Sequence, residues 1–167
     1  MTANIEVNTE NKFLPSSDEL PQVYLLYGMH GAGKSCMLKS VMHIFENRKQ
    51  FSWGITFAEP DEYTWMPSQS VHIYDNEYFQ NYINNLRQIQ KHGQRKMPPN
   101  FVIFDDNNGT LAQNEFILNF LSTHRQTNTT IFMLTSAMAV PTSAIWRVNT
   151  TCTIVVPTFP EGFQLKF

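Results

Sequence analysis

Eight consecutive residues near the amino end of the chain combine glycines, a lysine and a serine at a spacing that could bind phosphate groups. Residues 28–35 are Gly-Met-His-Gly-Ala-Gly-Lys-Ser and match the pattern G-x-x-x-x-G-K-[ST] in full. In such a loop the glycines let backbone N–H groups surround the phosphates, the lysine reaches the outer phosphates, and the hydroxyl ligates Mg²⁺. The nucleotide-binding residues predicted on this basis are Gly28, Met29, His30, Gly31, Ala32, Gly33, Lys34, Ser35 and Cys36.

An acidic pair, Asp105 and Asp106, is the second feature with a clear chemistry. The pair directly follows the apolar run 101–104. A carboxylate at the end of a buried strand can hold Mg²⁺ beside a phosphate loop, so we predict Asp105 as a metal ligand together with Ser35. A second carboxylate can polarise an attacking water, which is the role we predict for Asp106. The alternative without a catalytic role is that residues 105–109 form a polar turn that ends the strand, because Asp, Asn and Gly are all turn residues.

These residues need particular elements to position them, and the sequence predicts those elements. Residues 23–27 form a continuous apolar run, which is typical of a strand buried on both faces. Apolar residues from 34 to 45 recur at helical spacing. Further strands are expected over 53–57, 71–74, 101–104, 130–134 and 153–156, and helices over 76–91, 111–123 and 144–148. Because strands alternate with helices, we predict a three-layer α/β fold with a mostly parallel sheet.

Length and composition narrow the class of protein further. The 167 residues suggest a loose arm over 1–20 and a single domain over 21–167. The content of 42% hydrophobic and 16% charged residues excludes a disordered chain or a coiled coil. The net charge of −2 gives no global positive field for nucleic acid, although a local groove could still bind it. Two cysteines, Cys36 and Cys152, exclude a disulfide framework and a four-ligand zinc site. The longest nearly apolar run, 131–140, is too short to cross a bilayer, so a soluble protein of a reducing compartment is expected.

The order of these motifs resembles that of the viral genome-packaging ATPases of poxviruses and other large DNA viruses. That family is a branch of the FtsK/HerA class of P-loop ATPases. The resemblance covers residues 23–156. Its more specific parts are 125–136, which is similar to an Arg-His pair followed by a polar link and a strand ending in Thr-Gln, and 140–141 with 145–149, which are similar to a Pro-containing loop and an Ile-x-Arg-x-Asn element.

The resemblance implies a P-loop NTPase fold and a Mg²⁺-dependent ATPase that uses ATP and Mg²⁺. By position, it implies that Lys34, Asp106 and Arg125 are catalytic, with Arg125 as an arginine finger that reaches a neighbouring subunit. It also implies a homo-oligomeric ring that pumps double-stranded DNA into capsids, a capsid or portal protein as partner, and no membrane. The expected location is the host cytoplasm, a virus assembly site or the virion.

Two positions depart from the family pattern and keep other functions open. Gln126 stands where the family has His, and Ser136 stands at the position of its sensor glutamine. The first alternative function is a small P-loop kinase, although only Arg125 and Arg147 follow the acidic pair. The second is a nucleotide-binding subunit that has lost hydrolysis, because the short Ser136 side chain cannot replace a glutamine.

Two surface features also have competing interpretations. The basic stretch 91–96 could contact DNA phosphates, but a solvated helix end is the preferred interpretation. The aromatic residues Tyr63, Trp65 and Tyr78 could stack on a base, but packing under the acidic loop that follows strand 53–57 is preferred.

Overall fold

A single parallel sheet organises the protein. The computed structural model describes residues 19–93, 97–106, 109–136 and 144–156. Its strands are β1 (Val23–Tyr27), β2 (Trp53–Phe57), β3 (Val71–His72), β4 (Asn100–Asp106), β5 (Thr129–Thr135) and β6 (Cys152–Val155). Every strand pair is parallel, and the order across the sheet is β3-β2-β4-β5-β1-β6. This order places β5 between β1, which leads into the phosphate loop, and β4, which carries the acidic pair.

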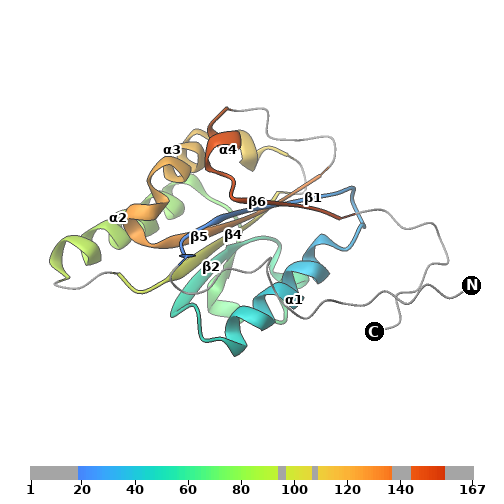
Figure 1. Ribbon diagram of the computed structural model, residues 1–167, viewed down its shortest axis with the longest axis horizontal. Coiled ribbons are helices and arrows are strands. Elements are labelled where there is room, and N and C mark those ends of the chain that lie inside the picture. Colours follow the sequence, from blue (N-terminus) through green and yellow to red (C-terminus); the bar gives the residue numbers. More distant parts are fainter. Residues whose placement is uncertain (1–18, 94–96, 107–108, 137–143, 157–167) are drawn as a thin grey trace, which may run out of the picture.

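Helices cover both faces of this sheet. The helices are α1 (Lys34–Asn47), α2 (Asn76–His92), α3 (Glu115–Thr123) and α4 (Ala144–Asn149). Figure 1 shows α2, α3 and α4 on one face and α1 on the other. Short 3₁₀ turns join the elements: η2 (Pro60–Tyr63), η3 (Ser68–Ser70), η4 (Leu111–Gln113) and η5 (His124–Thr127). The predicted three-layer α/β fold is therefore confirmed.

The alternation of side chains along β4 divides the core into two halves. Phe101 and Ile103 pack with Leu38 and Phe45 of α1. Their neighbours in sequence, Val102 and Phe104, pack on the other face with α2 and α3. Because successive side chains in a strand point to opposite faces, Asp105 continues the α1 side and Asp106 continues the α2–α3 side.

Most predicted elements agree with the structure to within two residues at each end, and two depart in a way that has a clear physical cause. The helix expected from residue 111 begins at Glu115, because the Asn114 side chain accepts hydrogen bonds from Phe116 N at 3.0 Å and Ile117 N at 3.4 Å. That cap fixes the start of the helix and leaves η4 before it. The strand expected over 71–74 has only two paired residues, Val71 and His72, opposite the end of β2.

The predicted loose arm over 1–20 lies mostly outside the described residues, which begin at Glu19. Leu20 is 5% exposed and belongs to the core.

The cap of α2 gives a direct test of the fold. The Asp75 carboxylate accepts a hydrogen bond from Tyr78 N at 2.8 Å, as its position in the sequence predicts. Replacing Asp75 with Ala should lower the free energy of unfolding by about 1 kcal/mol, because a helix amide loses its partner. Urea unfolding measures this change. Asp61→Ala is the matched control, because Asp61 is exposed in a 3₁₀ turn that has no side-chain cap. Equal stability of the two variants would contradict the capping role.

Candidate nucleotide-binding site

The loop between β1 and α1 has two glycines in the left-handed backbone region. Gly31 and Gly33 have φ values of 75° and 91°, in a region that side-chain-bearing residues rarely adopt. Gly33 is also the N-cap of α1 and offers no side chain to the first turn. The first amides of a helix lack partners within the helix, and they attract anions such as phosphate. The loop geometry therefore fits the predicted phosphate-binding role.

The first glycine of the loop is required by close packing. A Cβ atom on Gly28 would lie 2.6 Å from the carbonyl oxygen of Val156. The chain is held this close because Val156 N donates to Tyr27 O at 2.7 Å and Gly28 N donates to Thr135 O at 3.3 Å. The end of β1 is thus fixed against both of its neighbouring strands.

Lys34 lies folded across this loop. Its Nζ donates to the carbonyl oxygens of Gly28 and Met29, each at 3.0 Å, and the residue is only 6% exposed. A buried ammonium group needs strong acceptors, and phosphate oxygens are stronger acceptors than neutral carbonyls. The structure thus places a positive charge at the centre of the predicted phosphate site.

Ser35 and Asp105 are in contact on the α1 face of the sheet. This is the arrangement that the predicted metal site requires. Ser35 Oγ donates to Asp105 Oδ2 at 3.2 Å. The second carboxylate oxygen, Oδ1, is buried and has no hydrogen-bond partner among the described residues. A buried acceptor without a partner is costly unless something occupies it. This oxygen therefore fits a cation or a water that a cation holds.

The composition of the site suits Mg²⁺ better than a metal held by protein ligands alone. Among the described residues, no group of three or more His, Cys, Asp or Glu could hold a metal ion. Mg²⁺ is commonly held by one or two protein oxygens, waters and substrate phosphates. Ser35 and Asp105 are the residues that would hold it here.

Tyr63 also lies at this site, although no pattern in the sequence places it there. Its Oη donates to Asp105 Oδ2 at 2.6 Å, and the residue is 1% exposed. Burial, and then the negative charge of Asp105, raise the pKa of the Tyr63 phenol, so the phenol stays protonated and donates. The expectation that Tyr63 packs under the acidic loop is confirmed, whereas its hydroxyl contact depends on the pairing of β2 with β4, which the sequence does not reveal.

Asp106 lies on the other face of β4, away from Asp105. It is 2% exposed, and its Oδ2 accepts a hydrogen bond from Ala112 N at 2.8 Å. The Trp146 indole donates to Ala112 O at 2.6 Å, so Ala112 links Asp106 of β4 to Trp146 of α4. In this structure Asp106 anchors η4, and its predicted role in polarising water stays a prediction.

The predicted sensor position lies at the carboxyl end of β5. Thr135 pairs in register with Tyr27 on one side and Asp106 on the other. Ser136, which follows Thr135 directly, is half-buried. The topology therefore places Ser136 between the start of the phosphate loop and the acidic pair, and its role stays untested.

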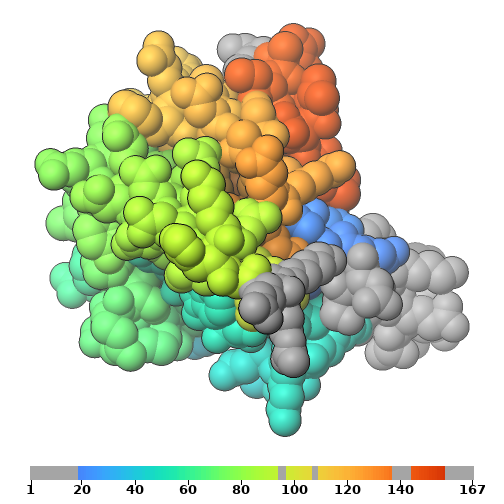
Figure 2. Space-filling model, turned by 90° about the vertical axis from the view of Figure 1, so that its left-hand side faces the viewer, coloured from blue at the N-terminus to red at the C-terminus, as the bar shows by residue number. Residues whose placement is uncertain are grey.

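Arg125 lies at the amino ends of the strands, whereas the phosphate loop lies at their carboxyl ends. It is exposed in η5, which precedes β5. The 7 residues of β5 span roughly 20 Å at about 3.3 Å per residue, so Arg125 cannot reach the loop of its own chain. Figure 2 looks onto the amino ends of the strands. There, the yellow-green end of α2 lies beside the orange surface of α3 and of the turn η5. Lys91 and His92 end α2 on this side, while the rest of the basic stretch, 94–96, lies outside the described residues.

The remaining predicted loop residues face outward. Met29, His30, Gly31, Gly33 and Cys36 are exposed, and Ala32 is half-buried. Their predicted contacts with a nucleotide are untested.

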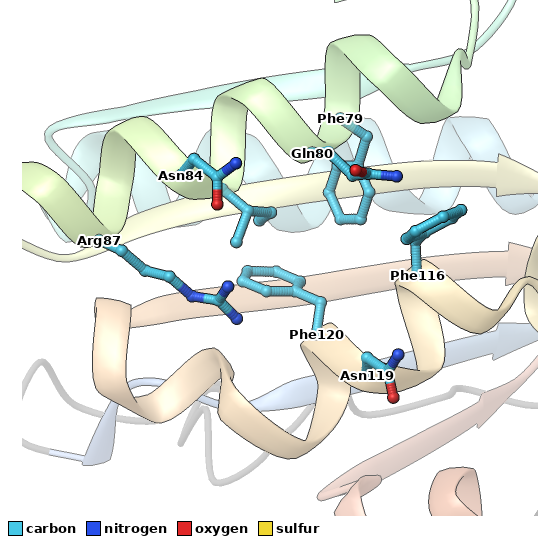
Figure 3. Close-up of a pocket in the computed structure, with 8 residues that line it drawn as sticks. Phe79, Gln80, Asn84, Arg87, Phe116, Asn119 and Phe120 are labelled. Carbon is cyan, nitrogen blue, oxygen red and sulfur yellow. The ribbon is translucent and has the colours of Figure 1, made fainter.

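Two hollows lie away from the phosphate loop. Figure 3 shows one of about 210 Å³ between α2 and α3, with Arg87 and Phe116 at its sides. Arg87 is held there by a 3.4 Å hydrogen bond to Thr123. The other, of about 540 Å³, lies along α1 and includes Trp53 and Trp65. Neither hollow is lined by a phosphate-loop residue.

A parallel sheet with this loop between β1 and α1, and with a serine–aspartate pair beside it, has the arrangement of the predicted P-loop NTPase fold. No protein-family model and no curated protein matches the chain. Among solved structures, the cytoplasmic domain of EssC is similar, with a TM-score of 0.56 and 14% identity over 80% of this chain and 30% of that one. The C. elegans protein PCH-2 has a TM-score of 0.49 and 15% identity, over 81% of this chain and 34% of that one. The KaiC-like protein PH0186 of Pyrococcus horikoshii has a TM-score of 0.47 and 15% identity, over 81% of this chain and 72% of that one.

The likeness to EssC supports a common fold, and at 14% identity it shows the fold and nothing finer. The chain spans less than a third of the EssC domain. Within the part of the chain that the structure describes, no helix has the length and apolar character needed to span a bilayer.

The position of Lys34 gives a test of the site. Lys34→Ala should weaken nucleotide binding by about 100-fold, because phosphate charge loses its only buried cationic partner in the loop. Titration with a fluorescent ATP analogue measures this affinity. Lys39→Ala, on the exposed side of the same helix, controls for the loss of charge and should bind normally. Unchanged affinity in the Lys34 variant would rule out this loop as the phosphate site.

Proposed function

We propose that the protein binds ATP with Mg²⁺ at this loop and hydrolyses it. The observation that carries the proposal is the contact of Ser35 with Asp105 beside the buried ammonium of Lys34. Lys34 and Ser35 are adjacent in the phosphate loop, Asp105 lies 70 residues after Ser35, and together they supply the cation and oxygen ligands that a Mg²⁺–nucleotide complex requires. Lys34 and the loop amides would bind the phosphates, Ser35 and Asp105 would hold Mg²⁺, and the metal would neutralise charge on the phosphates.

A more specific proposal concerns the assembly. We propose that the chain is a subunit of a ring ATPase that moves double-stranded DNA into capsids, with a capsid or portal protein as its partner. The motif order described above supports this proposal. The exposure of Arg125 about 20 Å from its own loop also supports it, because an arginine finger at this place acts only on a neighbouring subunit. Lys91 and His92 end α2 on the same side; DNA contact is the less favoured interpretation of this basic stretch, after a solvated helix end.

A nucleotide-binding subunit without turnover is the second candidate. Ser136 at the sensor position and the engagement of the Asp106 carboxylate by Ala112 N favour it. The kinase alternative gains no support, because Arg125 lies at the far edge of the sheet.

Substitution of Asp106 separates the two candidates. Asp106→Asn keeps an acceptor oxygen for Ala112 N but removes the negative charge, so the fold and the nucleotide affinity should be unchanged. If the carboxylate polarises water, steady-state ATP hydrolysis should fall by about 100-fold or more. Equal turnover in the variant and the parent would remove Asp106 from the mechanism. Tight Mg²⁺–ATP binding by the parent with no turnover, with or without DNA, would favour the second candidate.

A mixing experiment tests the ring and the finger together. Arg125→Ala should bind nucleotide normally but hydrolyse it slowly, because the transition-state charge loses its partner in the next subunit. Mixed with Lys34→Ala, which keeps Arg125, it should regain activity at the shared interface. The measurement is ATPase rate per subunit across protein concentrations, with and without long double-stranded DNA.

Arg48→Ala, at the exposed end of α1, is the control and should hydrolyse ATP at the parental rate. A rate independent of protein concentration, with no recovery on mixing, would rule out action between subunits. A ring that turns over equally with and without DNA would rule out DNA as its substrate.

A further inference from the structure

We propose that Tyr63 is a positioning residue for the metal site, holding the Asp105 carboxylate in the orientation that receives Mg²⁺. This inference rests on the proposed function, because it concerns the same Mg²⁺ site.

Two hydroxyl groups converge on one oxygen of the carboxylate. Tyr63 Oη lies 2.6 Å and Ser35 Oγ 3.2 Å from Asp105 Oδ2. Both donate to this oxygen, so Oδ1 is left buried and without a hydrogen-bond partner among the described residues. The two bonds therefore assign different roles to the two oxygens: Oδ2 fixes the orientation of the carboxylate, and Oδ1 is kept for the cation or its water.

Tyr63 is the more permanent of the two donors. Ser35 is expected to offer a lone pair to Mg²⁺, and its proton has to adjust to that geometry. Tyr63 has no such second task in the site. Its short distance is typical of an O–H bond to a charged oxygen, which is about twice as strong as a neutral hydrogen bond.

The surroundings of Tyr63 fix the hydroxyl in place. The residue ends the 3₁₀ turn η2, which Pro60 begins, and its ring lies 5.5 Å from that of Trp65. The residue is 1% exposed, so water cannot readily replace the phenol as a donor to Asp105. The turn follows β2, and β2 pairs with β4, which brings Tyr63 to the carboxylate although 42 residues separate them.

The variant Tyr63→Phe removes the hydroxyl and keeps the ring. Without the bond, the carboxylate can rotate, and the affinity for Mg²⁺ should fall. Removing an outer partner of a metal ligand typically lowers metal affinity 10- to 100-fold. We therefore expect the Mg²⁺ concentration at half-maximal binding of a fluorescent ATP analogue to rise by about 10-fold. Binding of the same analogue in EDTA should not change, because the loop and Lys34 are intact.

The matched control is Tyr24→Phe. Tyr24 is 0% exposed in the same half of the core, and its Oη is buried with no hydrogen-bond partner among the described residues. This variant also removes a buried hydroxyl, but one that does not touch Asp105. Its Mg²⁺ midpoint should match that of the parent, and thermal unfolding should show that both variants are folded.

A Mg²⁺ midpoint in Tyr63→Phe within twofold of the parent would overturn the inference. An equal shift in the two tyrosine variants would overturn it too, since any lost hydroxyl would then have the same effect. The proposed function fails in a different way: the parent itself would bind the analogue no better with Mg²⁺ than in EDTA, and Asp105→Asn would behave like the parent. In that case there is no Mg²⁺ site, and the positioning role of Tyr63 is overturned together with the proposed function.

Discussion

The hydrogen bond between Ser35 and Asp105 joins residues that are 70 positions apart, and the candidate site depends on it. Ser35 lies in the first turn of α1, which follows β1, and Asp105 lies near the end of β4. The two strands are not neighbours, because β5 lies between them. The contact forms only because all the strands run parallel and end at one edge. There, loops and helix amino ends meet, which is where α/β sheets bind ligands.

The two-fold alternation of a strand imposes the second constraint. Adjacent acids cannot serve the same face, so Asp105 joins Ser35 and Tyr63 while Asp106 joins Ala112. One carboxylate thereby faces the proposed metal site, and the other accepts a hydrogen bond from the η4 turn before α3. An acidic pair in sequence is thus not an acidic pair in space.

Aromatic packing holds α1 against the sheet. The rings of Tyr24 and Phe132 stack at 5.0 Å on the sheet, and Phe45 of α1 meets both of them edge-on. Aromatic pairs of this kind add to the energy of burial and fix the approach of the helix. Because α1 begins at Lys34, the packing of α1 against the sheet also helps to set the position of the phosphate loop.

The sequence by itself determined the elements and the chemistry carried on the chain. Local patterns specify the phosphate loop, the strand–helix alternation and the Asp75 cap, because each depends on residues within a few positions of one another. The sequence also named Lys34, Ser35 and Asp105, since their spacing from glycines or from a buried strand is itself local. Only the tertiary structure decided which side chains meet. Strand order brought Tyr63 to Asp105, alternation separated Asp106 from it, and strand direction placed Arg125 at the far edge. Those relations depend on pairings between distant segments, and no local pattern encodes them.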